Sequence, residues 1–227
     1  MSGLLCLALL LAASPAAPLN TDGFRLYQAK KYPEALEKFR AAVAADEQHA
    51  LAQYNFAATL ALLRGQGKVC EFDAYPGAIL EHLEAAVRLD ERRRQRMKVD
   101  RDFDSVRDTL RYQQLLGRSP ASEKDARALL LALTWLAPAT GAYGHPLTLK
   151  LSADGSLTLT RLVLTDDDVK HDVVKGRWKV KGFQVTLDFE HPVEGQKQAV
   201  GKLTAEGHLL FGLPAWDLSD QRSECDA

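Results

Sequence analysis

The sequence predicts an α+β protein of two domains, an N-terminal α-helical solenoid and a C-terminal antiparallel β meander that forms a small barrel or sandwich. Two observations lead to this fold class. A helical segment of the first half is repeated, and after about residue 133 the spacing of apolar residues changes from a helical period to a period of two. The segment Gly117-Arg118-Ser119-Pro120 interrupts the helical pattern and separates a domain of residues 17–118 from one of residues 119–227.

Composition and charge are those of an ordinary globular protein. The 227 residues include 29 Lys and Arg against 30 Asp and Glu, and 46% of them are apolar. A protein that binds nucleic acid or an anionic membrane would be expected to show a basic excess in these totals. The balance argues against both kinds of partner.

The first 16 residues have the features of a signal peptide. No charged side chain occurs before residue 18, and the apolar run from Leu4 to Ala13 precedes the small residues Ser14-Pro15-Ala16-Ala17. This run is shorter than the about 20 apolar residues of a transmembrane helix, so we expect no stable membrane span. Cleavage after Ala16 would give a periplasmic or secreted protein, and a buried N-terminal helix is the alternative.

Cleavage would leave two cysteines, Cys70 and Cys225, in an oxidising compartment. Neither has the Cys-x-x-Cys spacing or the nearby His of a zinc or redox site. We predict a Cys70–Cys225 disulfide, and two unrelated thiols are the alternative.

The repeated segment reads YPEALEKFRAAVAAD from Tyr32 and YPGAILEHLEAAVRLD from Tyr75. Apolar residues in both copies follow the i, i+1, i+4, i+7, i+8 spacing of one helical face. Pro33 and Pro76 fit the first helical turn, where a missing N–H costs nothing. A repeated helical unit predicts a solenoid.

These segments resemble tetratricopeptide (TPR) repeats, whose units are pairs of antiparallel helices. Small and aromatic residues of the first unit fit the family pattern, namely Gly23, Tyr32, Ala35, Phe39 and Ala42. The second unit begins with QYNFAATLALL at Gln53 and contains an inserted loop of residues 65–74. The chain departs from the pattern at Glu47 and Glu91, where the repeat usually has Pro. The segment from Glu91 to Gly117 is similar to the closing turns of TPR proteins.

The resemblance implies a concave groove that binds an extended or helical peptide. First helices of the repeats line this groove in the family, which places eight residues on or beside it: Asn20, Phe24, Tyr27, Gln28, Leu51, Tyr54, Asn55 and Ala58. The basic clamp that some TPR domains use for a C-terminal carboxylate is not expected, because Asn20 and Phe24 stand where it would begin. In the alternative interpretation, Phe24, Tyr27 and Tyr54 belong to the core.

A cluster of basic residues follows the second unit, at Arg92, Arg93, Arg94, Arg96 and Lys98. Because Asp100, Asp102, Asp104 and Asp108 follow at once, the local charge nearly cancels. We interpret this cluster as a solvated, salt-bridged surface rather than a phosphate or nucleic-acid site.

The C-terminal half predicts six to eight short antiparallel strands, with alternating runs at residues 147–151, 156–160, 178–180 and 183–189. A shift of phase between Leu159 and Leu162 predicts a bulge. Ser122 and Asp125 predict the cap of a short helix before the strands. The sequence pattern around Gly176-Arg177-Trp178 is similar to that of lipocalin-like or META-like β domains. Three tryptophans either line a ligand cavity or fill the core, namely Trp135, Trp178 and Trp216.

Common catalytic signatures are missing from the sequence, so we do not expect an enzyme. The acidic segment Asp166-Asp167-Asp168 with His171 and Asp172 is explained by a solvated hairpin tip, and we expect no metal or cofactor. The predicted function is an exported, non-catalytic protein–protein interaction or scaffold module that uses the TPR-like groove. The alternative is a carrier of a small apolar ligand in the β domain. The identity of a protein or peptide partner and the oligomeric state stay open.

Overall fold

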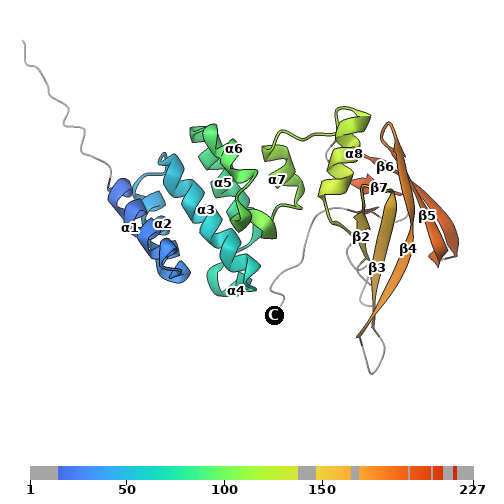
Figure 1. Ribbon diagram of the computed structural model, residues 1–227, viewed down its shortest axis with the longest axis horizontal. Helices are drawn as coiled ribbons and strands as arrows, with labels where there is room; N and C mark the ends of the chain where they lie inside the picture. Colours follow the sequence, from blue (N-terminus) through green and yellow to red (C-terminus); the bar gives the residue numbers. More distant parts are fainter. Residues whose placement is uncertain are drawn as a thin grey trace, which may run out of the picture. The chain divides into compact units, whose positions relative to one another are not determined.

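The computed structural model describes residues 15–137, 147–164, 169–193, 195–205, 207–211 and 217–218. The chain divides into two compact units, Met1–Arg96 and Met97–Ala227. The first unit is helical and the second contains the β-sheet (Figure 1), which confirms the predicted α+β fold with two domains. The division lies earlier in the chain than the predicted linker at residues 117–120.

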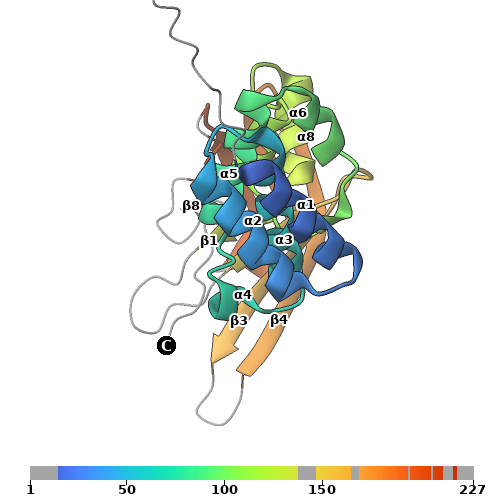
Figure 2. The same ribbon diagram turned by 90° about the vertical axis from the view of Figure 1, so that its left-hand side faces the viewer.

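The helical unit is a stack of helices that pack on their neighbours in chain order. Its helices are α1 (Ala16–Gln28), α2 (Tyr32–Ala45), α3 (Ala50–Gly65), α4 (Val69–Phe72), α5 (Pro76–Leu89) and α6 (Arg92–Met97). Helix α1 packs on α2, α2 on α3, and α3 on α5 (Figure 2). Pro33 and Pro76 lie in the first turns of α2 and α5 as predicted. The short helix α4 lies in the segment predicted as an inserted loop, and it contains Cys70.

Close approach of α1 and α2 depends on Gly23. A Cβ atom at this position would lie 2.7 Å from both Cδ1 and Cε1 of Phe39. The Phe39 ring is buried, with 1% of its surface exposed. The glycine therefore makes room for the aromatic ring of the next helix, which is the role of a small residue at a tight helix crossing.

A partly buried polar contact joins α3 to α5. His82 Nδ1 lies 2.6 Å from Gln53 Oε1, and Gln53 Nε2 donates to the carbonyl of Glu47 at 2.9 Å. Because the amide nitrogen of Gln53 is already a donor, its oxygen accepts and the imidazole carries its proton on Nδ1. Burial lowers the pKa of His82, and nearby Glu81 opposes this shift. His82 is therefore neutral in the native state at pH 7.

Three short helical segments open the second unit, η1 (Arg101–Ser105), α7 (Leu110–Leu115) and α8 (Glu123–Ala132). Tyr112 of α7 contacts Phe103 of η1, with the ring centroids 6.1 Å apart, and its hydroxyl donates to Met97 O at 2.6 Å. Burial raises the pKa of Tyr112 to about 12. Thr134 donates to Asp108 at 2.8 Å and links this segment to the start of the sheet. The predicted cap of α8 is confirmed, because the Ser122 hydroxyl accepts from the Asp125 N–H at 3.2 Å.

Within the described residues, eight antiparallel strands follow in the order of the chain, as a meander. They are β1 (Trp135–Ala137), β2 (Leu147–Leu151), β3 (Ser156–Leu164), β4 (Val169–Lys181), β5 (Gln184–Val193), β6 (Gln196–Leu203), β7 (Leu209–Leu210) and β8 (Asp217–Leu218). Strand β8 contacts β1, so the sheet nearly closes into a barrel. This agrees with the predicted meander, and of the two predicted forms, barrel or sandwich, the sheet has the barrel form.

Apolar side chains fill the inner face of the sheet. Trp135 and Trp178 belong to this core, with 0% and 4% of their surfaces exposed. Their indole nitrogens donate to Leu130 O at 3.1 Å and to Ser152 O at 2.9 Å. Both rings therefore pack the core with their polar atoms satisfied. Trp216 lies outside the described residues.

The predicted bulge near Leu159 is wrong. Strands β3 and β4 keep one register from the pair Ser156–Arg177 to the pair Leu164–Val169, and the sheet shifts register instead between β5 and β6. The shift of phase has another cause. The pairing of β3 with β2 ends at Arg161, so its last residues pair with β4 alone, in a two-stranded ribbon (Figure 1). The change of period along the sequence is therefore not produced by an extra residue in this ladder.

Candidate functional site

The helical unit has a groove of about 270 Å³ to which three helices contribute. Its lining residues are Asn20, Thr21, Phe24, Leu51, Asn55, Arg93 and Arg96. They come from α1, α3 and α6, and on each helix they follow the i, i+3 or i, i+4 spacing of one face. The groove is thus formed by aligned faces of three helices.

Four of the eight predicted groove residues line this groove, namely Asn20, Phe24, Leu51 and Asn55. The others lie elsewhere. Tyr54 and Ala58 are buried, with 1% and 5% exposed. Tyr27 is half-buried and contacts the Tyr32 ring edge to face at 5.3 Å, and Gln28 is exposed at the end of α1.

An amide pair forms the polar part of the groove. Asn55 Nδ2 donates to Asn20 Oδ1 at 2.9 Å, across α1 and α3. Asn20 is buried, with 5% of its surface exposed, and Asn55 is half-buried. Each side-chain amide has two N–H donors and an acceptor oxygen, so one mutual bond does not use all of their hydrogen-bonding capacity. One donor and one acceptor side by side match the peptide group of an extended chain.

Phe24 and Leu51 form the apolar part of the groove. Their exposed fractions are 44% and 36%, and both are among the most exposed large apolar side chains that the structure describes. Phe24 stacks on Tyr27 with the ring centroids 6.3 Å apart and the planes nearly parallel. The phenyl ring therefore has one aromatic neighbour on its own helix, and nearly half of its surface stays accessible.

Two guanidinium groups complete the groove, and the sequence did not predict them. Arg93 and Arg96 lie over the Tyr54 ring, at 6.0 and 5.9 Å from its centroid. Tyr54 was predicted to contact a ligand, whereas the structure places it beneath these two cations, where its π-face stabilises them. Arg93 also pairs with Asp90 at 3.1 Å, and its buried Nε has no acceptor among the described residues.

The basic cluster therefore has two parts. Arg92 pairs with Asp90 at 2.8 Å and Arg94 with Glu91 at 2.6 Å. Together with the Arg93–Asp90 pair, they form the predicted salt-bridged surface, with acidic partners that precede the cluster rather than follow it. The hydrogen bonds from Arg92 lower the pKa of Asp90 and keep this carboxylate ionised. Arg93 and Arg96 face the groove because they are three residues apart on α6, and this i, i+3 spacing is the signal that could have identified them.

Other predicted features lie partly or wholly outside the described residues. These are the signal peptide up to residue 14, Cys225, and the acidic segment 166–168. The nearby Asp172 pairs with Arg161 at 2.7 Å. Within the described residues, no group of three potential metal ligands occurs, and no helix is long and apolar enough to cross a bilayer.

No family model matches this sequence, and no curated protein is similar to it.

Proposed function

We propose that the protein is an exported, non-catalytic interaction or scaffold module whose helical groove binds an extended peptide segment of a partner protein. The observation that carries this proposal is the meeting of exposed apolar side chains, an amide pair and two guanidinium groups in one groove. The TPR resemblance supports a peptide as the ligand, and the features of residues 1–16 support export to the periplasm or the exterior.

Each part of the groove corresponds to one part of a peptide. Phe24 and Leu51 would contact an apolar side chain of the peptide. At protein interfaces a few residues carry most of the binding energy, and aromatic residues and arginine are enriched among them. The Asn20–Asn55 pair would hold the backbone. Arg93 and Arg96 would bind a carboxylate, so the preferred segment has an acidic residue close to an apolar one.

The size of the groove and its residue types favour binding over catalysis. About 270 Å³ holds two or three side chains of a longer chain and is smaller than a typical small-molecule site. Its lining has no His, Cys, Asp or Glu to act as a base or nucleophile, and the Thr21 hydroxyl donates to Ala17 O at 3.0 Å.

Selection from a random peptide library on the chain that starts at Ala17 tests this proposal. We expect peptides with paired acidic and apolar residues, whose binding is then measured by fluorescence anisotropy. Arg96→Gln should weaken binding about tenfold or more, since a hydrogen bond to a charged group contributes about 1.5–3 kcal/mol. Arg92→Gln is the matched control on the same helix, because Arg92 is exposed outside the groove.

A double-mutant cycle then assigns the contact. If the peptide carboxylate contacts Arg96, a peptide with an amide in place of this carboxylate should bind the wild-type protein more weakly. The same peptide change should not weaken binding to the Arg96→Gln variant any further. Phe24→Ala should also reduce affinity, whereas Phe183→Ala, an exposed phenylalanine of the other unit, should not. Peptides that lack acidic residues, or whose affinity survives both Phe24→Ala and Arg96→Gln, would refute the proposed groove.

A further inference from the structure

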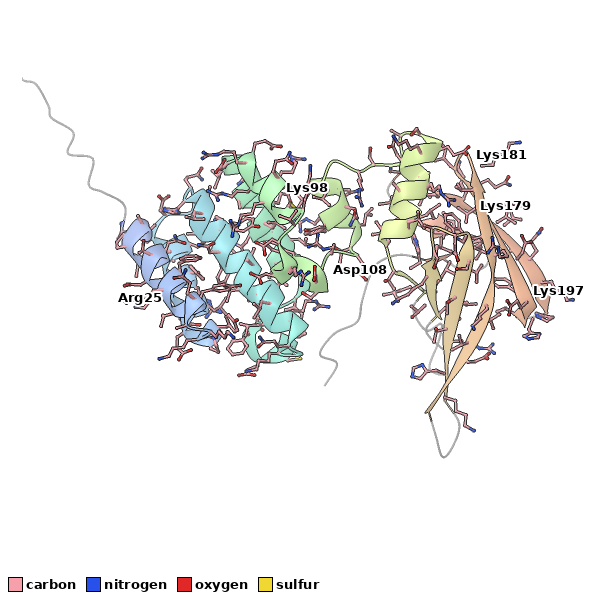
Figure 3. All side chains as sticks on the ribbon, in the orientation of Figure 1. Arg25, Lys98, Asp108, Lys179, Lys181 and Lys197 are labelled. Atoms are coloured by element: carbon pink, nitrogen blue, oxygen red, sulfur yellow. The ribbon has the colours of Figure 1, made fainter. Side chains whose placement is uncertain are left out.

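The outer face of the sheet carries a row of basic residues. On β4, Lys175, Arg177, Lys179 and Lys181 alternate with the inward-facing Gly176, Trp178 and Val180, so they share the outer face. Figure 3 labels Lys179 and Lys181 near one end of this strand, with their side chains extending outward from the ribbon.

Neighbouring strands extend this row into a face. The register places Lys181 opposite Gln184 of β5, and Gln184 opposite Lys202 of β6. Lys181 and Lys202 are thus two strands apart, about 10 Å. On the other side, Lys150 of β2 and Lys175 of β4 both lie opposite Thr158 of β3. We call the five exposed lysines 150, 175, 179, 181 and 202 the lysine face.

The lysine face has few compensating charges. None of its five ammonium groups forms an ion pair with another residue that the structure describes. Two carboxylates follow on β5, where Asp188 lies opposite Arg177 and accepts from Gln198, and Glu190 is exposed. Glu123 of α8 is engaged by the backbone N–H of Gly182 at 2.6 Å. A chain with a net charge of −1 therefore carries a basic face on this sheet.

An open apolar cleft of about 540 Å³ lies at the Lys181–Lys202 end of this face. Phe183, Val200 and Leu210 line it, and 36%, 45% and 38% of their surfaces are exposed. Lys181 and Lys202 also line the cleft. Exposed apolar side chains with lysines around them form an amphipathic surface.

We propose that the lysine face docks on an anionic lipid bilayer, with Phe183, Val200 and Leu210 inserted at the level of the headgroups. Charge complementarity identifies the occupant, because Lys181 and Lys202 lie beside the exposed apolar side chains of the cleft, and an anionic bilayer presents negative headgroups beside its apolar layer. The apolar side chains line an open cleft and are accessible to solvent, whereas the binding site of a carrier encloses most of its ligand. Lysine stems can lie along the apolar surface while their ammonium groups reach lipid phosphates.

Vesicle co-sedimentation of the chain from Ala17 tests this docking. We expect binding to vesicles of phosphatidylcholine mixed with phosphatidylglycerol, no binding to phosphatidylcholine alone, and a loss of binding as salt is raised. Each lysine should contribute about fivefold in affinity. The triple variant Lys179→Gln, Lys181→Gln, Lys202→Gln should therefore bind about a hundredfold more weakly.

The matched control is a triple variant of the helical unit that removes the same number of positive charges, at exposed positions: Lys30→Gln, Lys31→Gln, Lys38→Gln. It should bind anionic vesicles like the wild type. Phe183→Ser should weaken vesicle binding while leaving all lysines in place, and circular dichroism confirms that each variant is folded. Equal binding by the two triple variants would overturn the proposal. So would capture of soluble polyglutamate without vesicle binding, since this would identify an acidic protein as the occupant.

Discussion

Replacing Gly23 by alanine should destabilise the helical unit, although alanine is the better helix former. The new Cβ would lie 2.7 Å from two carbons of the Phe39 ring and 3.2 Å from Lys38 Cβ. Carbon atoms pack best at about 3.5–4.0 Å, so the methyl group overlaps the ring by about 1 Å. Phe39 is buried and cannot swing into solvent to make room.

Two opposing terms give the size of the effect. Overpacking of a dense core costs about 1–3 kcal/mol, and the overlap with two atoms of a buried ring places Gly23→Ala near the upper end. Alanine recovers about 1 kcal/mol in a helix interior. The net loss of about 1–2 kcal/mol in the free energy of unfolding should lower the melting temperature of a unit of this size by roughly 5–15 °C.

Thermal unfolding followed by far-UV circular dichroism measures this loss, because the helical unit contains most of the helices. Gly77→Ala is the control. Gly77 lies in the first turn of α5, and a Cβ there would meet nothing within 4 Å. The control should leave the melting temperature unchanged or raise it slightly. If Gly23→Ala behaved like the control, the tight crossing of α1 and α2 would be refuted.

Three further predictions concern other buried or paired groups. Burial lowers the pKa of His82 below its ordinary value of 6.5, so its stabilisation is complete above about pH 6.5 and is lost as pH falls toward the lowered pKa; His82→Phe should flatten the pH dependence of the urea midpoint in that range, and an unchanged slope would contradict this. Trp135→Ala should cost about 3–5 kcal/mol, seen as loss of near-UV circular dichroism, because the ring is fully buried. Peptide mapping without reductant should give a linked Cys70–Cys225 peptide from the exported protein, where a loop of this length contributes at most about 5 kcal/mol; two alkylated cysteines would exclude the disulfide.

The helical half could be predicted in detail because its sequence repeats. The period of apolar residues and the early prolines located α2 and α5, and Ser122 located the start of α8. Groove residues were harder to predict. Sequence spacing places Tyr54 next to Asn55 on the first helix of the repeat, but a side chain one position along turns by about 100° and points into the core.

In the β half, predictions succeeded where one face of a strand is buried, as in β2. Most of the long strand β4 was missed because its inner face is not uniformly apolar. Gly176 occupies an inner position, where the backbone of Asp188 comes so close that a Cβ would overlap its carbonyl oxygen. Val173 lies on the outer face. With Gly176 on the inner face and Val173 on the outer face, apolar and polar residues do not alternate along β4, so the sequence did not show the period of two.

The near-zero net charge of the sequence did not indicate either of the two proposed binding surfaces. A chain with a net charge of −1 was expected to have no basic face, yet opposite charges in a folded protein need not lie side by side. Arg93 and Arg96 line the groove, although Arg93 also pairs with Asp90, and the lysine face is basic because alternate residues of one strand share a side. Over a Debye length of about 10 Å, a partner experiences only such local groups of charges. The arrangement of charge within each helix and strand, rather than its sum, therefore determines which anionic partners each unit can bind.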